Sequence, residues 1–383
     1  MANKRMSNLM QSEIRNMSIE CDRVNGINLS QGICDLPLTR EITDGVAEAL
    51  SKGINQYTRY DGLDEIRQAI GKKAEHFNHI HNNPDTDIIV TCGATGALYS
   101  ACIALLSPGD EVMLFQPFYG YHEYTLQAAD LVPVYINLTP PEWKFNMDEL
   151  EKAVTGKTKA IIINTPANPC GKVFSREELE ILGDFCIRHD LLIFTDEIYE
   201  YITYDQKEHV SPASISAICD RVITISGYSK TFSITGWRIG YSIAEKQYAR
   251  LIGIASDLIY VCAPAPLQYA VAQAIQKLPD DFYQGLKNEF TMKRKILCQA
   301  LEDCGLTPYV PQGAYYVLAD IGRLHGNTSK EKCMWLLEKT GVAAVPGESF
   351  YHGSGGETLA RFCFAKDDNV LNEAAERLKI LFQ

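Results

Sequence analysis

The sequence has no pair of cysteines in a C-x-x-C pattern and no apolar run long enough to span a bilayer. Its twelve cysteines are scattered singly along 383 residues, whereas disulfide frameworks belong mainly to small secreted domains. The N-terminus, MANKRMSNLMQSEIRNMS, also lacks the apolar core of a signal peptide. We therefore expect a cytoplasmic protein without membrane contacts, in which most cysteines are reduced and buried.

Basic residues are scarce as well. The chain carries 36 Lys and Arg against 48 Asp and Glu, with a pI near 5.2. Because the acidic residues are spread along the chain, we expect no nucleic-acid partner. The apolar fraction of 46% is that of an ordinary globular protein, and the length exceeds what one hydrophobic core usually supports. Two domains are therefore expected.

What the sequence does contain is an alternation of short apolar runs with longer amphipathic runs, which is typical of β/α units around a mostly parallel sheet. Helices are expected at 95–106 and 175–190, the second with a capping box formed by Ser175 and Glu178. The apolar runs that predict strands lie at 87–91, 111–116, 160–164, 191–195 and 222–226. These patterns predict an α/β fold.

Each predicted strand is followed by a polar or glycine-containing segment. In order, these segments are CGAT, QPFYGY, NTPANP, TDEIY and GYSK. Because ligands bind at the carboxyl ends of the strands in open parallel sheets, we expect these five loops to converge on one site.

The pattern changes after about residue 280, where a long helical run is followed by short strands such as GAYYVLAD and ARFCFAK. This part predicts a smaller α+β domain. We expect a large domain over residues 41–280 and a small domain formed by residues 1–40 and 281–383.

Two charged residues follow predicted strands. Lys230 is either a surface lysine with a buried stem or a partly desolvated amine that forms a Schiff base with a carbonyl compound, and its position alone does not decide. Asp196 directly follows LLIFT, and a buried Asp needs a cationic partner. The protonated ring nitrogen of pyridoxal phosphate would be such a partner.

Other residues of these loops suit an anionic, aromatic ligand. Gly93, Ala94 and Thr95 offer backbone amides and a hydroxyl at a helix N-terminus, which favours a phosphate, and Arg238 on the apolar run WRIGYS could supply its countercharge. Phe118 is either a core residue or a surface on which a flat ring stacks. Arg361, on an apolar strand, needs a carboxylate from the protein or from a substrate.

The histidines do not indicate a metal-binding site. His76, His79 and His81 lie in the polar stretch HFNHIHNNP without a Cys or an acid at ligand spacing, which favours a solvated helix end.

Taken together, these segments resemble the pyridoxal-phosphate-dependent class I and II aminotransferases of fold type I. The motifs SKTFSITGWRIGY, NTPANPCG, TDEIY and PGESF occur in the order and spacing of that family, and the resemblance covers nearly the whole chain. It implies a homodimer with shared sites, a transaminase activity and pyridoxal 5'-phosphate as the cofactor.

The resemblance also assigns a role to individual residues. Lys230 would form the Schiff base with the cofactor and Asp196 would pair with the pyridine nitrogen, while Tyr199 and Asn168 would contact the phenolic oxygen. The remaining assignments are Phe118 stacking on the ring, Gly93, Ala94, Thr95 and Arg238 at the phosphate, Gly32, Asn168 and Arg361 at the substrate carboxylate, and Tyr57 at the phosphate of the neighbouring subunit.

One position departs from the family pattern. The family has Ser three residues before the lysine as a phosphate ligand, whereas this chain has Gly227 there. Either Ser226 or Ser229 replaces the missing hydroxyl, or the phosphate has one ligand fewer.

Within the family, segments such as GATGALYSA and QPFYGY are most similar to the branch of kynurenine, glutamine and methionine aminotransferases. Its substrates are aromatic, sulfur-containing or glutamine-like, and the tyrosines Tyr119, Tyr121 and Tyr124 are compatible with them. Specificity for aspartate would need an additional cation to bind its side-chain carboxylate. Arg59 or a lysine elsewhere in the chain could supply it.

Three further alternatives are a C–S β-lyase of the same fold, a nicotinamide dehydrogenase and a non-catalytic binding protein. The sequence does not match the glycine-rich motif that a nicotinamide dehydrogenase needs, because CGATGA lacks the third glycine and the next strand ends in Gln116 rather than in an acid.

Overall fold

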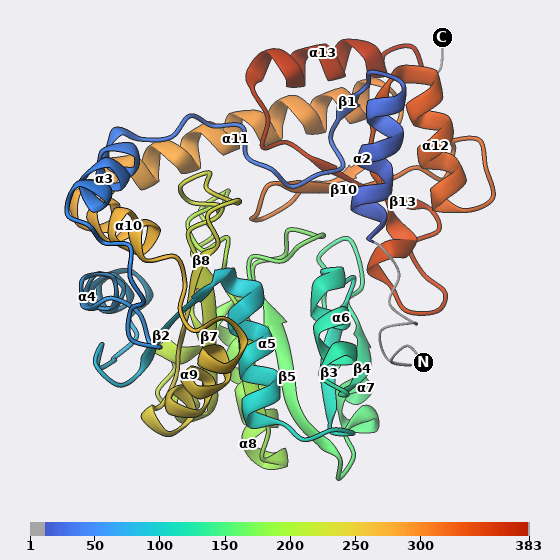
Figure 1. The fold of residues 1–383 in the computed structure, drawn as a ribbon. Coiled ribbons are helices and arrows are strands. Elements are labelled where there is room, and N and C mark those ends of the chain that lie inside the picture. Colours follow the sequence, from blue (N-terminus) through green and yellow to red (C-terminus); the bar gives the residue numbers. More distant parts are fainter. Residues whose placement is uncertain (1–11, 382–383) are drawn as a thin grey trace, which may run out of the picture.

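The computed structural model describes residues 12–381, and it contains a seven-stranded sheet covered by helices on both faces (Figure 1). β8 runs antiparallel to both of its neighbours, and all other neighbouring strands of this sheet are parallel. The strand order is β2 (Ile88–Cys92), β8 (Ile239–Ile243), β7 (Val222–Gly227), β6 (Leu192–Asp196), β5 (Thr158–Asn164), β3 (Glu111–Gln116) and β4 (Val132–Asn137). The predicted α/β fold with a mostly parallel sheet is confirmed.

The helices cover the sheet because one side of each is apolar. On one face, α8 (Arg176–His189) buries Leu179, Leu182 and Phe185, and it begins with the predicted capping box of Ser175 and Glu178. The opposite face carries α5 (Gly93–Leu105), α6 (Gly120–Ala128) and α9 (Lys246–Tyr260). The remaining helices of this part are α3 (Arg40–Ser51), α4 (Asp64–Lys73), α7 (Met147–Ala153) and α10 (Ala265–Lys277).

A second, antiparallel sheet lies above the first in Figure 1. Its strand order is β12 (Val345–Pro346), β13 (Leu359–Cys363), β10 (Tyr316–Asp320) and β9 (Thr307–Tyr309). Around it pack α2 (Glu13–Arg23), α11 (Asp280–Asp303), α12 (Ser329–Thr340) and α13 (Asp368–Leu378).

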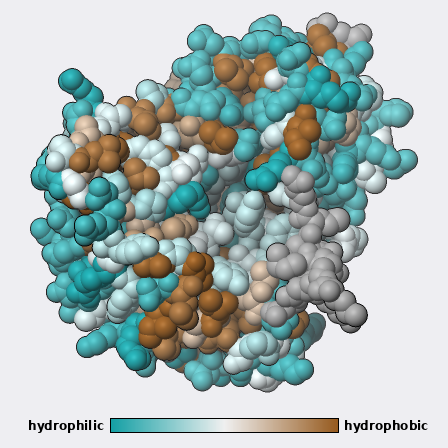
Figure 2. Space-filling view, viewed as in Figure 1, coloured by the Kyte–Doolittle hydropathy of each residue, from teal (hydrophilic) through white to brown (hydrophobic). Residues whose placement is uncertain are grey.

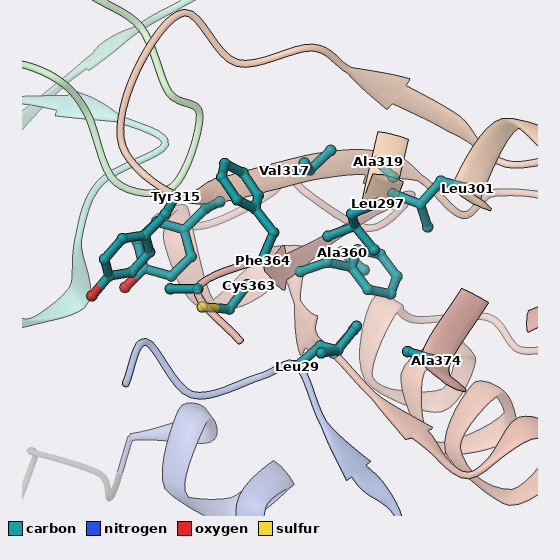
Figure 3. Packing of buried hydrophobic residues seen from close by; sticks show 14 of the residues in the cluster. Leu29, Leu297, Leu301, Tyr315, Val317, Ala319, Ala360, Cys363, Phe364 and Ala374 are labelled. Atoms are coloured by element: carbon teal, nitrogen blue, oxygen red, sulfur yellow. The ribbon is translucent and has the colours of Figure 1, made fainter. Parts of the chain in front are cut away.

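This upper part has its own apolar core, in which Leu29, Leu297 and Phe364 come from distant parts of the chain (Figure 3). The short strand β1 (Ile27–Asn28) pairs in parallel with β11 (Val342–Ala343), which ties the N-terminal segment to the C-terminal region. The domain boundaries after residues 40 and 280 stay a prediction.

All twelve cysteines are free thiols, and most of them are buried, as expected. Burial raises the pKa of the Cys102 thiol to about 12, so this sulfur is an unreactive core atom. None of the described helices is long and apolar enough to cross a membrane. The cytoplasmic location stays a prediction.

Candidate active site

A cavity of about 240 Å³ lies between the two sheets, at the carboxyl ends of the parallel strands. All five predicted loops contribute to its wall, so the expected convergence is confirmed. The contributing residues are Ala94, Thr95, Tyr119, Tyr121, Asn164, Asn168, Asp196, Ile198, Tyr199, Ser229 and Lys230.

Lys230 lies at the bottom of this cavity, in the loop after β7. Its ammonium group donates to the Gly32 carbonyl at 3.1 Å and lies 5.6 Å from the centroid of the Tyr315 ring. Burial disfavours the charged form and lowers the pKa of Lys230 to about 8, and the positive charges of Arg361 and Arg238 act in the same direction. A neutral, nucleophilic amine is therefore readily available near neutral pH.

This pKa predicts how the cofactor is captured. Because only the neutral amine attacks an aldehyde, the rate at which apoprotein binds pyridoxal phosphate covalently should rise roughly tenfold per pH unit below about 8 and level off above it. Stopped-flow absorbance from pH 6 to pH 10 measures this profile. A rate that keeps rising up to pH 10 would mean that Lys230 titrates like an exposed lysine.

Asp196, the last residue of β6, faces the cavity with a carboxylate that is largely buried. His122 Nε2, on α6, lies 2.8 Å from Asp196 Oδ2, and the Ile198 amide donates to Oδ1 at 3.3 Å. The sequence did not single out His122, although its place in the first turn of the helix after QPFYGY was a usable signal. The histidine fixes the orientation of the carboxylate toward the cavity.

The N-terminus of α5 forms one end of the cavity. Gly93 has φ of 74°, and a Cβ atom there would lie 2.3 Å from Nη2 of Arg238. The glycine therefore lets the guanidinium lie directly against the start of the helix. Ala94 and Thr95 line the cavity beside it, so amides, a hydroxyl and a cation meet at one point.

Arg238 is not on a strand as predicted. β8 begins one residue later, and Arg238 has φ of 59°, in the left-handed region. Its Nη1 donates to the Thr235 carbonyl at 2.9 Å, and no carboxylate pairs with it among residues 12–381. This conformation turns the guanidinium out of the sheet and toward the cavity.

Arg361, on β13, enters the cavity from the upper sheet and is fully buried. Its Nη1 donates to Asn168 Oδ1 at 2.8 Å, its Nη2 donates to the Ser30 carbonyl at 2.7 Å, and its Nε has no partner. In the described part of the chain no carboxylate pairs with it. A buried guanidinium held only by neutral groups lacks a countercharge.

Two tyrosines complete this wall. The Tyr199 hydroxyl lies 3.1 Å from that of Tyr316, on β10, and burial raises the pKa of Tyr199 well above its usual value. Both hydroxyls are therefore protonated donors at neutral pH. Tyr316 also packs against Arg361, whose guanidinium carbon lies 4.2 Å from its ring centroid. The sequence did not indicate Tyr316 as a site residue.

Phe118, which was expected to face the ligand, lies outside the wall of the cavity. Phe118 is buried in the core next to Tyr135, and its amide donates to the Phe350 carbonyl at 2.9 Å. This bond turns the side chain inward, so that the next residue, Tyr119, lines the cavity instead. The Tyr119 ring stands edge-on to His122, at 5.4 Å between centroids.

The two remaining predicted residues lie in different places. Gly32 lines the cavity, and a Cβ atom there would lie 1.8 Å from the Tyr316 hydroxyl, so the position requires glycine. Tyr57 lies outside the cavity wall of this chain and is 83% exposed.

The structure also accounts for Gly227. A Cβ atom on Gly227 would lie 2.9 Å from both Gly240 Cα and the Ile239 carbonyl of β8. Ser226 is buried and donates to the Glu197 carbonyl at 3.3 Å, away from the cavity, whereas Ser229 lines it. Of the two serines, Ser229 is therefore the one whose side chain lines the cavity.

We expect Gly227→Ser to lower the free energy of unfolding by about 1 to 3 kcal/mol, since the new side chain forces β7 and β8 apart. The control is Gly285→Ser on α11, where a Cβ atom would meet no atom within 4 Å. Urea unfolding measures both variants. If the two variants are equally stable, the close contact between β7 and β8 does not prevent a side chain at residue 227.

A second polar cluster lies behind the end of β6. The ligand atoms of Glu197, Glu200 and His209 are within 4.8 Å of one another, a spacing that would suit a metal ion. Glu197 is bound by His209 at 2.7 Å and by two hydroxyl groups, and Glu200 is bound by Lys73 at 2.5 Å and by Asn78 at 2.8 Å. Every carboxylate oxygen thus has a protein partner, and the cluster supports the strand end that carries Asp196.

Comparison with known proteins agrees with this geometry. Residues 24–378 match the family model of aminotransferase class I and II. The chain is 35% identical to kynurenine–oxoglutarate transaminase 3 of Rattus norvegicus over 380 residues, covering 91% of this chain and 84% of that protein. It is 32% identical to the methionine aminotransferase of Escherichia coli, covering 95% and 94%.

The fold is shared as well. The solved structure of N-succinyldiaminopimelate aminotransferase from Mycobacterium tuberculosis superposes with a TM-score of 0.96 at 32% identity, and the match covers 100% of both chains.

Proposed function

The chain belongs to the class I and II aminotransferases, which use pyridoxal phosphate, and on this premise we propose how its residues divide the work. It is an enzyme that moves an amino group from an L-amino acid to a 2-oxo acid, as the sequence predicted. The bound cofactor supplies an electron-withdrawing ring that delocalises the charge left on the substrate Cα.

The residues of the cavity fit this cofactor. Arg238 without a carboxylate partner, beside the bare backbone at Gly93, suits the phosphate, and Ser229 and Thr95 add hydroxyls. Asp196, held by His122, suits the ring nitrogen. We assign Tyr119 rather than Phe118 to the face of the ring, and Asn168 and Tyr199 to its phenolic oxygen.

We assign two duties to Lys230. Its amine would hold the cofactor aldehyde as a Schiff base, and as a free amine it would accept and return the proton of the substrate Cα. A pKa of about 8 suits both, because the amine must accept and return a proton near neutral pH. The rings of Tyr199 and Tyr315 lie 6.0 Å and 5.6 Å from its ammonium group and cover one side of it.

The observation that carries the proposal is the uncompensated, buried Arg361. A substrate α-carboxylate supplies the missing negative charge, and its binding to Arg361 orients the Cα–H bond toward Lys230. Gly32 lets its backbone lie directly against the Tyr316 hydroxyl, because a side chain at this position would overlap that group.

For the amino donor we propose aromatic, sulfur-containing or glutamine-like amino acids. The relatives named for kynurenine and methionine support this class, as do Tyr119 and Tyr121 in the cavity wall. Incubation of the protein with pyridoxal phosphate, 2-oxoglutarate and each of twenty amino acids tests it. We expect glutamate to form fastest with this class. Ammonia and pyruvate without glutamate would indicate the β-lyase instead.

We also propose a homodimer in which Tyr57 reaches the phosphate of the neighbouring subunit. An apolar patch covers α9 and α5, which pack side by side, and it is visible as the brown area in the lower half of Figure 2. Its exposed side chains are Ile103, Leu251, Ile254, Leu258, Ile259 and Val261. A patch of this kind marks a protein interface, and it lies beside the phosphate end of the cavity.

Leu258 is 83% exposed, and Leu258→Glu should convert the dimer into a monomer by placing charges in the interface. Sedimentation measures the mass of the variant. Its affinity for pyridoxal phosphate should also fall, because a monomer lacks the Tyr57 of a neighbouring subunit. Glu245→Lys, at the opposite end of α9, is the control. A Leu258→Glu protein that stays dimeric would place the interface elsewhere.

A further inference from the structure

Tyr316 connects two parts of the cavity wall for which we propose different roles. It is the first residue of β10, and it lies opposite Cys363 on β13, on the same face of the sheet as Arg361. The Arg361 guanidinium packs on its ring, with 4.2 Å between the guanidinium carbon and the ring centroid. The Tyr316 hydroxyl lies 3.1 Å from that of Tyr199. Tyr316 thus contacts both Arg361 and Tyr199.

The surroundings hold the Tyr316 hydroxyl in one place. The side chain is buried and lines the cavity, and the Tyr315 ring packs against it at 4.9 Å between centroids. The backbone of Gly32 lies directly against the hydroxyl, since a Cβ atom at residue 32 would lie 1.8 Å from it. Burial raises the pKa of Tyr316 to about 12, so the hydroxyl keeps its proton at neutral pH. It is a fixed donor for an oxygen beside it.

The two hydroxyls share one hydrogen bond, and which of them donates depends on the acceptors nearby. In the structure, Tyr199 donates to Tyr316. Each hydroxyl has one proton to donate and can still accept a bond. An anionic phenolic oxygen is a stronger acceptor than a neutral hydroxyl. With such an oxygen in the cavity, the Tyr199 proton turns to it, and Tyr316 donates to Tyr199 instead.

The following role of Tyr316 rests on the proposed function, in which Tyr199 contacts the phenolic oxygen of the cofactor. We propose that Tyr316 is a positioning residue whose hydroxyl donates to Tyr199 and strengthens the bond from Tyr199 to that oxygen. The strengthening arises because hydrogen bonds in a chain polarise one another.

This bond affects the nitrogen of Lys230. Negative charge on the phenolic oxygen holds a proton on the Schiff-base nitrogen of Lys230, and donors that share this charge lower the pKa of that nitrogen. A nitrogen that has lost its proton can accept one from the ammonium group of the incoming amino acid, which makes the substrate amine nucleophilic. Tyr316 thereby lets the reaction start at lower pH.

Other titratable groups also act on these atoms, but the test leaves them unchanged. Tyr316→Phe removes one neutral hydroxyl and no charge. The groups that act electrostatically on Tyr199, Tyr316 or Lys230, or that face them in the cavity, are Cys34, Tyr119, Asp196, Arg238, Tyr315, Arg361 and Cys363. A shift in the variant therefore reports the bond between Tyr316 and Tyr199.

The test is a titration of the absorbance of the bound cofactor from pH 5 to pH 10, which gives the pKa of the Lys230 nitrogen. Tyr316→Phe should raise this pKa by about half a unit, and Tyr199→Phe by about one to two units. Adding Tyr316→Phe to Tyr199→Phe should change nothing further, because Tyr316 acts through Tyr199. In Tyr316→Phe, kcat/KM for the amino acid should fall about threefold at low pH and equal the native value at high pH.

The matched control is Tyr309→Phe on the neighbouring strand β9, where the ring packs against Trp143 outside the cavity wall. We expect it to titrate as the native protein does. The role of Tyr316 would be overturned, with the transaminase intact, by an absorbance that does not titrate, by no shift or a downward shift in Tyr316→Phe, or by the same upward shift in the Tyr199→Phe background. A native protein that binds the cofactor but transfers no amino group from any amino acid would overturn the proposed function itself.

Discussion

Replacing Lys230 by Ala should abolish transamination, with a loss of roughly 10⁴-fold or more in the rate of the first half-reaction, because the variant lacks both the covalent anchor and the group that moves the proton. The half-reaction is followed by the absorbance of the bound cofactor on mixing with an amino acid. Borohydride, which reduces a C=N bond, should attach the cofactor to the native peptide that contains Lys230 and to no peptide of the variant.

A surface lysine provides the comparison. Lys157→Ala, at an exposed position, should keep the native rate and the native labelling. The cavity of the Lys230→Ala protein should still bind the cofactor reversibly, since Arg238 and Asp196 are unchanged. A Lys230→Ala enzyme within tenfold of the native rate would show that another residue transfers the proton.

The second large effect is expected for Arg361→Ala. Truncating one partner of a buried charge pair costs roughly 2 to 5 kcal/mol. We therefore expect kcat/KM to fall roughly 30-fold to several-thousand-fold for both the amino acid and the oxo acid, since both carry the α-carboxylate. Steady-state kinetics in both directions measure this loss.

A thermodynamic cycle, in which Arg361 and the substrate carboxylate are removed singly and together, separates a loss of carboxylate binding from structural damage. Phenylalanine is compared with phenethylamine, which lacks the carboxylate, in the native protein and in Arg361→Ala. If Arg361 binds the carboxylate, the native enzyme should prefer phenylalanine strongly and the variant should barely distinguish the two amines. An equal loss for both amines would assign Arg361 to holding Asn168 and Ser30 in place.

Local patterns allowed most of the sheet and the site to be predicted. Apolar runs located β2, β3, β5, β6 and β7 to within a residue or two, as with the predicted strand at 160–164 and the observed β5 at Thr158–Asn164, whereas β4 was not predicted. The rule that loops at the carboxyl ends of parallel strands converge then brought Lys230, Asp196 and Asn168 together.

Details that depend on the backbone at one residue were not predictable. Phe118 and Tyr119 are adjacent aromatic residues, and no local pattern indicates that Tyr119 lines the cavity while Phe118 packs into the core. Arg238 was expected on a strand because its neighbours are apolar, whereas its left-handed conformation is set by the loop. Tyr316 enters the site from β10, a strand of the upper sheet whose packing against the cavity no local pattern reveals.

The hydrogen bonds of Arg361 have a consequence for how the enzyme is made. The arginine bonds to Ser30, 331 positions earlier in the chain, and to Asn168. During synthesis from the N-terminus, the large sheet can form while the carboxylate site is still missing, because all seven of its strands precede Arg361 in the chain. Contacts between such distant segments also form late in refolding, since closing a long loop costs entropy. A chain that stops before Arg361 therefore lacks the group that binds the substrate carboxylate, even where its large sheet has formed.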